Sequence, residues 1–142
     1  MPHLALPVFL ALAVLAAERP VTGARTCAVE ALLGTWKADS LTFDGKPQAD
    51  EEMLGARFTF TEDRLRIETA KAPLAFAISV DAGSAPCALH LDPLEGSREP
   101  EGWMLFEVHG SGLRLGFHDN LSRRPASFEA RPEMLVLRLS RQ

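Results

Sequence analysis

Alternation of apolar and polar residues is the feature that most constrains how this chain can fold. From Trp36 to the C-terminus large apolar side chains recur at every second position, as in Phe58 and Phe60 or in Ile78 and Val80. A period of two places these side chains on one face of a β-strand. The chain is therefore predicted to be all-β, with short strands that each bury one face.

Eight segments carry this pattern, and residues that favour turns separate them. We expect strands at Gly34–Phe43, Ala56–Glu62, Leu65–Thr69, Leu74–Asp81, Cys87–Asp92, Trp103–His109, Leu113–His118 and Met134–Ser140. The breaks, such as Asp44–Pro47 and Gly110–Gly112, are short, and short connections favour antiparallel neighbours. Helical turns are expected only at Val29–Leu33 and Gln48–Gly55. Eight strands suffice to close a small barrel, so we predict an antiparallel up-and-down barrel with a short N-terminal helical turn.

The N-terminus predicts export. The apolar run from Leu4 to Ala17 is shorter than the roughly 20 residues of a membrane-spanning helix and fits the core of a signal peptide. We expect residues 1–24 to be removed after Ala24, with Ala16 as the alternative cleavage site. The remaining residues, 25–142, are expected to form one secreted or periplasmic barrel domain without a stable membrane anchor.

The chain has two cysteines, Cys27 and Cys87. An even number of cysteines in an exported chain favours a disulfide, and two buried thiols are the alternative. Odd-numbered strands of a meander begin at the same end of the barrel. Cys27 precedes the first strand and Cys87 begins the fifth, so a bridge between them is compatible with the predicted topology.

One end of the barrel is expected to be closed by Trp36. Gly34 allows close backbone approach, and Trp36 lies on the same face of the strand, where its ring can fill the barrel end. The last strand should finish where the first begins, which brings Arg138 or Arg141 towards the indole for a cation–π contact. We interpret these residues as structural.

The order of short motifs along the chain resembles a known family. The motifs are Leu33–Lys37, Asp44–Lys46, Phe58–Phe60 with Leu65, Phe76 with Pro86, Leu89 with Leu91, Phe106–Val108 before Gly110 and Leu113, Arg124–Pro125 with Phe128, and Val136–Leu139. Together they resemble an uncharacterised lipocalin-like domain family best known from planctomycete secreted proteins. The resemblance extends from about Leu32 to Arg141. It implies a lipocalin-like barrel in a secreted or periplasmic protein, and it implies no activity.

The inward faces of the predicted strands are apolar. The residues expected to line the interior, where a small hydrophobic ligand would bind, are Phe58, Phe60, Ile67, Phe76, Ile78, Leu89, Leu91, Phe106, Val108, Leu115 and Phe117. Eight strands leave an interior that is either filled by side chains or holds one small ligand. The first hypothesis is therefore a barrel that binds a small hydrophobic molecule. The alternative is a solid-core interaction module that binds a protein partner.

The polar residues do not form a catalytic or metal-binding motif. His90, His109 and His118 are expected on outward faces, so we predict no metal, no cofactor and no enzymatic activity. Arg123 and Arg124 precede the last strand and are candidates either for contact with an anion or for fixing a loop. A net charge of -4 without a basic stripe argues against nucleic acid as a partner.

Overall fold

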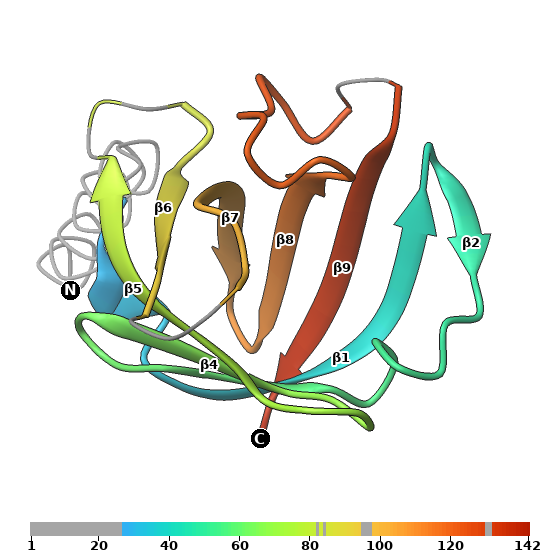
Figure 1. The fold of residues 1–142 in the computed structure, drawn as a ribbon, viewed down its shortest axis with the longest axis horizontal. Helices are drawn as coiled ribbons and strands as arrows, with labels where there is room; N and C mark the ends of the chain where they lie inside the picture. Colours follow the sequence, from blue (N-terminus) through green and yellow to red (C-terminus); the bar gives the residue numbers. More distant parts are fainter. Residues whose placement is uncertain (1–26, 82, 84, 95–97, 130–131) are drawn as a thin grey trace, which may run out of the picture.

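The described part of the chain is nearly all β (Figure 1). The computed structural model describes residues 27–81, 83, 85–94, 98–129 and 132–142. The predicted signal peptide, residues 1–24, lies outside the described residues. Within them the one helical segment is the 3₁₀ turn η2 (Val29–Ala31), which confirms the N-terminal helical turn.

Nine strands of the described residues form a single sheet. They are β1 (Gly34–Phe43), β2 (Lys46–Gln48), β3 (Arg57–Phe60), β4 (Arg64–Glu68), β5 (Leu74–Asp81), β6 (Ala88–Pro93), β7 (Gly102–His109), β8 (Gly112–His118) and β9 (Met134–Arg141). Each of the eight predicted strands is present, and the bounds differ by a few residues at most. Residues Ala56 and Glu62, for example, lie outside β3.

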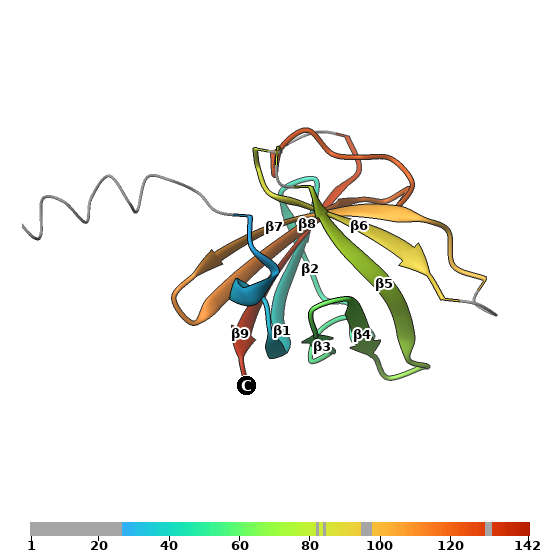
Figure 2. The ribbon, with the colours of Figure 1, turned by 90° about the vertical axis from the view of Figure 1, so that its left-hand side faces the viewer.

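The sheet closes on itself as a barrel. Every pair of neighbouring strands is antiparallel, and β3 to β9 follow one another in sequence order. β1 pairs with β3 on one side and with β9 on the other, so eight strands complete the ring. Figures 1 and 2 show β9 beside β1 after the chain has turned once round the barrel. The predicted eight-stranded up-and-down barrel is confirmed.

β2 was not predicted. The sequence pattern assigned Lys46 and Pro47 to a turn, whereas the turn consists of Asp44 and Gly45 alone, with φ values of 53° and 80°. Two consecutive residues with positive φ give the tight hairpin whose twist matches that of its strands. Lys46–Gln48 therefore pairs at once with the end of β1 and forms an edge strand outside the ring. A proline is tolerated there because an edge strand has one side without ladder partners.

The interior of the barrel is one contiguous apolar cluster. Trp36, Phe58, Phe60 and Phe76 are its largest fully buried side chains. Leucines and isoleucines from the inward faces of the remaining strands pack against them. The residues predicted to face inwards do so in each strand. The inward face is strongly specified, because a shift in register by one residue would turn a whole set of apolar side chains outwards into water.

A second, smaller cluster lies on the outside of the barrel. Phe128, in the connection between β8 and β9, packs against Ala88, Leu105 and Met134. A Cβ on Gly116 of β8 would lie 2.8 Å from a carbon of the Phe128 ring, so the glycine lets this ring lie directly on the strand. The β8–β9 connection therefore covers part of the outer face (Figure 1).

Candidate functional site

The predicted ligand-lining residues are packed against one another. Phe58, Leu89 and Leu115 have no accessible surface, and Phe60, Phe76, Leu91 and Phe106 keep 3% or less. Ile67 and Ile78 keep 6% and 8%, and Val108 and Phe117 are partly buried against the same cluster. A side chain that lines a cavity wide enough for water retains accessible surface towards that cavity. The centre of the interior is therefore filled by protein side chains.

Trp36 closes one end of the barrel as expected. Its indole Nε1 donates a hydrogen bond of 2.8 Å to the carbonyl oxygen of Leu32. The guanidinium of Arg141 lies 4.1 Å from the ring centroid and donates to the carbonyl oxygen of Leu33 at 2.8 Å. Gly34 has a φ of 112°, and a Cβ there would lie 3.2 Å from Nη1 of the same guanidinium. A side chain at this position would thus press on the cation that covers the indole.

Arg138 does not take part in this closure. It pairs in register with Ser40, whereas the register partner of Trp36 is Arg141, and the Arg138 side chain is exposed. Because residues on a strand alternate between faces, Arg141 shares the inward face of Leu137 and Leu139, whereas Arg138 points outwards. Of the two predicted arginines, only Arg141 contacts the indole.

Cys27 and Cys87 form a disulfide, with 5.2 Å between their Cα atoms. The bridge fastens the segment before η2 to the residue that precedes β6, so it joins two parts of the chain that are 60 residues apart in sequence. The predicted pairing is confirmed. Disulfides persist mainly in oxidising compartments, which agrees with a protein that functions outside the cytosol.

Arg124 fixes the β8–β9 connection to the barrel. Its Nη2 donates to Oδ2 of Asp81 at 2.6 Å, and its guanidinium lies 4.3 Å from the centroid of the Trp103 ring. The hydrogen bond from Arg124 lowers the pKa of Asp81. Arg124 is thus occupied by a carboxylate of its own chain, as the loop-fixing alternative predicted. Arg123 lies in the same connection, and its Nη1 is 3.4 Å from Nε2 of His118 at the end of β8.

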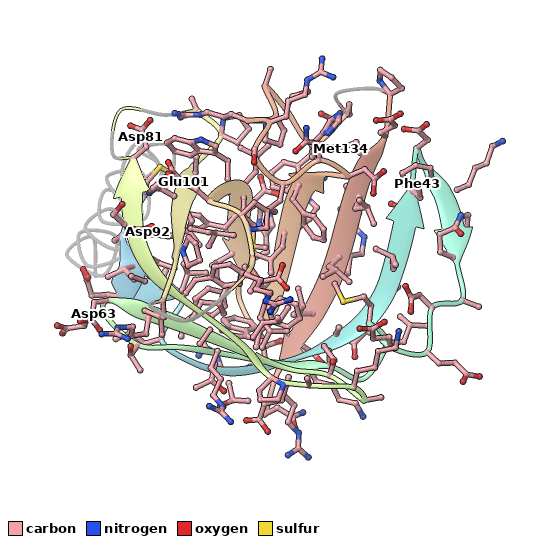
Figure 3. The ribbon with its side chains drawn as sticks, in the orientation of Figure 1. Phe43, Asp63, Asp81, Asp92, Glu101 and Met134 are labelled. Atoms are coloured by element: carbon pink, nitrogen blue, oxygen red, sulfur yellow. A yellow bond between two sulfur atoms is a disulfide. The ribbon has the colours of Figure 1, made fainter. Side chains whose placement is uncertain are left out.

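Trp103 lies between Arg124 and His90 and contacts both side chains. The imidazole of His90 stands edge-on to the indole, with centroids 4.9 Å apart, and its Nε2 contacts a carboxylate oxygen of Glu101. Figure 3 labels Asp81 and Glu101, the two acids at the ends of this series of contacts. The groups hold β5, β6, β7 and the β8–β9 connection together on the outer face.

His118 is buried, although an outward-facing histidine was expected to be solvated. This residue is on the outer face, as expected, but it keeps only 7% of its surface because the β8–β9 connection covers it. Its Nδ1 accepts a hydrogen bond from the backbone N–H of Asn120 at 3.0 Å. His109 is exposed and its Nε2 lies 3.0 Å from a carboxylate oxygen of Glu107.

A row of polar residues crosses four strands of the outer face. In register order it contains Glu107 of β7, Arg114 of β8, Arg138 of β9 and Ser40 of β1. The Arg114 Nη2 donates to Oε1 of Glu107 at 2.8 Å, and its guanidinium lies 3.8 Å from the centroid of the Phe128 ring. Burial raises the pKa of Glu107, but hydrogen bonds and positive charge from His109 and Arg114 outweigh this effect, so the pKa is lowered.

Two hollows on the outer face meet at Arg114 and Arg138. The first has a volume of about 180 Å³ and is lined by Ser40, Thr42, Asp44, Gly45, Arg114, Phe128, Glu129, Met134, Val136 and Arg138. The second, of about 380 Å³, is lined by Glu107, His109, Gly112, Leu113, Arg114, Arg138 and Leu139. Arg114 and Phe128 were not predicted as site residues. The tight Gly110–Ser111 hairpin would have placed Glu107 opposite Arg114, but nothing in the sequence sets the register of β8 against β9.

A third hollow lies at the rim beside β2. It has a volume of about 430 Å³, and its lining combines the apolar Leu41, Phe43 and Leu135 with the polar Gln48, Asp50 and Glu51. Phe43, labelled in Figure 3, stands opposite Leu135 where β1 leaves β3 and pairs with β2 instead. Partly buried apolar side chains are therefore available at this rim.

Comparisons with known proteins assign no family to this chain. No protein-family model, no curated protein and no solved structure matches this chain. The described residues contain no helix that is long and apolar enough to span a bilayer. The resemblance to the lipocalin-like domain family stays a prediction.

Proposed function

We propose that this protein is an exported barrel domain with a filled interior, and that it binds other molecules through its outer surface and rim. The observation that carries the proposal is the complete burial of the central inward side chains, including Phe58, Leu89 and Leu115. Two functions were predicted, and this burial favours the interaction module over a barrel that holds a hydrophobic ligand.

Barrels of eight strands are close to the size limit for an internal site, so the volume of the inward side chains decides between the two functions. Four fully buried aromatic residues, Trp36, Phe58, Phe60 and Phe76, occupy the interior here. A pocket for a drug-sized ligand has a volume of about 300 Å³ or more, and smaller ligands need less space. The hollows on the outer face and at the rim supply space of that order, together with charged and hydroxyl groups that can orient a bound molecule.

Export is supported by the disulfide and by the predicted signal peptide. A bridge between Cys27 and Cys87 forms most readily in an oxidising compartment. We propose that the mature domain begins near Ala24 and functions in a periplasm or an extracellular space. Its binding partner would then be another exported protein or a small molecule of that compartment.

Native mass spectrometry of the protein purified from an exporting host tests the filled interior. We expect the mass of the disulfide-bonded chain alone, and no stabilisation of the wild type by benzene. Leu115→Ala is the matched variant, because truncation of a fully buried leucine leaves an apolar cavity of the kind that binds benzene. Leu137→Ala, at another fully buried position, replaces it if Leu115→Ala does not fold. A retained apolar molecule, or saturable binding of benzene to the wild type, would overturn the proposal.

A further inference from the structure

The outer-face row places two arginines directly opposite each other. Arg114 of β8 and Arg138 of β9 are register partners. Like charges at directly opposed positions destabilise a sheet unless other groups compensate them. Arg114 is compensated, because Glu107 accepts its hydrogen bond and Phe128 covers its guanidinium. Among the described residues, the Arg138 side chain has no hydrogen bond or ion pair, so one positive charge of the row is uncompensated.

The hollow of about 180 Å³ extends from this charge along β9. Register pairs order its lining: Ser40 lies opposite Arg138, and Thr42 lies opposite Val136. Beyond them the backbone N–H of Met134, a residue labelled in Figure 3, donates to Oδ1 of Asp44 at 3.2 Å. One end of the hollow therefore presents guanidinium and hydroxyl donors, its middle is apolar, and its far end carries a carboxylate.

Phe128 forms an apolar wall of the same hollow. Its ring can lie on β8 because residue 116 is glycine, and Met134 packs against the ring from β9. The ring also stacks on Arg114, which limits the directions in which that guanidinium can turn. A ligand whose head group contacts Arg114 and Arg138 would thus have an apolar surface, formed by Phe128 and Val136, directly beside the head group.

We propose that this hollow binds a small organic carboxylate, with its charged group between Arg114 and Arg138 and its apolar part against Val136 and Phe128. The inference rests on the proposed function, since it uses the outer surface as the binding surface. A single negative charge suits the site, because one arginine is uncompensated while Asp44 and Glu129 at the hollow would repel a second charge. A guanidinium and a carboxylate also form strong charge-assisted hydrogen bonds.

Titration with benzoate, followed by backbone amide NMR shifts, tests this site. We expect saturable shifts at Ser40, Val136 and Arg138, with a Kd of about 1 mM, which is typical of a small ligand with few contacts. Benzamide keeps the ring and lacks the charge, and acetate keeps the charge and lacks the ring. Both should bind at least about tenfold more weakly than benzoate, because each lacks one of the two contacts.

Arg138→Gln should weaken benzoate binding about tenfold or more, since it removes the uncompensated charge and leaves the interior unchanged. Arg64→Gln is the matched control, because Arg64 is an exposed arginine on β4, away from the hollow, and its removal should leave the Kd unchanged. Equal Kd values for the two variants, or for benzoate and benzamide, would overturn the proposal, as would the absence of shifts at tens of millimolar benzoate. Shifts confined to inward residues such as Leu115 would overturn the proposed function as well.

Discussion

At the scale of single residues, Arg141 shows how one side chain can close a barrel. Its guanidinium covers the buried Trp36 ring and also donates to the carbonyl oxygens of Leu33 and Ala31, at 2.8 Å and 3.3 Å. Ala31 is the last residue of η2, and Leu33 lies between η2 and β1, so neither residue belongs to a strand. Arg141 thus ties the end of β9 to the start of the barrel and satisfies acceptors that would otherwise need water.

Truncation of this arginine should destabilise the protein. We expect Arg141→Ala to lower the free energy of unfolding by about 1 to 3 kcal/mol, because it removes a cation–π contact and hydrogen bonds made by a charged group. Urea denaturation followed by tryptophan fluorescence measures the change. The matched control is Arg138→Ala, whose exposed side chain has no partner among the described residues, and it should change stability by less than about 0.5 kcal/mol. Equal losses in the two variants would contradict this role of Arg141.

At the scale of elements, the β7–β8 hairpin carries a charge arrangement that depends on pH. Glu107 accepts a hydrogen bond from Arg114 directly across the hairpin and lies 3.0 Å from Nε2 of His109. Its pKa is lowered in the folded protein even though burial opposes this. A carboxylate with a lowered pKa stabilises the fold above its unfolded pKa, near 4.5, and that contribution is lost as the pH falls through the folded value.

The stability difference between wild type and Glu107→Gln should therefore depend on pH. We expect the wild type to be more stable by about 1 kcal/mol near pH 7, and the difference to shrink as the pH falls below the unfolded pKa of Glu107 and through its lowered folded pKa, where the side chain takes up a proton. Denaturant unfolding over this pH range measures it. Glu62→Gln removes an exposed carboxylate without an ion pair among the described residues, so as the control it should change the stability near pH 7 by less than about 0.5 kcal/mol. A wild-type advantage over Glu107→Gln that stays constant down to the acid limit would refute the assignment.

At the scale of the whole molecule, two long-range connections stabilise the barrel, and they join different parts of the chain. The β1–β9 ladder joins the first and last strands of the ring, and the disulfide joins Cys27 to Cys87 across a separation of 60 residues. The ladder pairs the edges of β1 and β9, which would otherwise invite pairing with other chains. The disulfide instead limits the conformations of the unfolded chain, so the two contributions add to stability by different routes.

Removal of the disulfide should cost more than any surface substitution. The double variant Cys27→Ala/Cys87→Ala is expected to be about 4 kcal/mol less stable, from the lost constraint on a 60-residue loop. Thermal and urea unfolding, with and without a reductant, measure the loss. A reductant should destabilise the wild type by a similar amount and leave the double variant unchanged. A double variant as stable as the oxidised wild type would show that the bridge contributes nothing.

The strands were predictable because their signal is local. Residues such as Phe58 and Phe60, or Leu137 and Leu139, mark an inward face through spacing alone, and a register error of one residue would place all of them in water. Because odd-numbered strands of a meander begin at the same end, the chain order also predicted that Cys27 lies near Cys87 and that the end of β9 lies near Trp36. β2 escaped prediction because a proline and a lysine in three residues resemble a turn, and only pairing with β1 makes them a strand.

The candidate site was only partly visible in the sequence. Arg138 was selected for the wrong contact, and Arg114 and Phe128 were not assigned a role in binding. Their meeting depends on the β8–β9 register and on a long connection that folds back over Gly116. No periodic pattern encodes either feature, since both are set by contacts between residues that are distant along the chain.

The sequence by itself determined the strands, their inward faces, the barrel class and the end of the barrel at which both cysteines lie, because alternation and chain order act over short distances or through simple parity. Only the tertiary structure decided that the interior is filled, that Arg141 rather than Arg138 covers Trp36, and that two arginines adjoin an apolar hollow on the outside. These outcomes depend on side-chain volumes and on the register between strands, which are settled only when the ring closes.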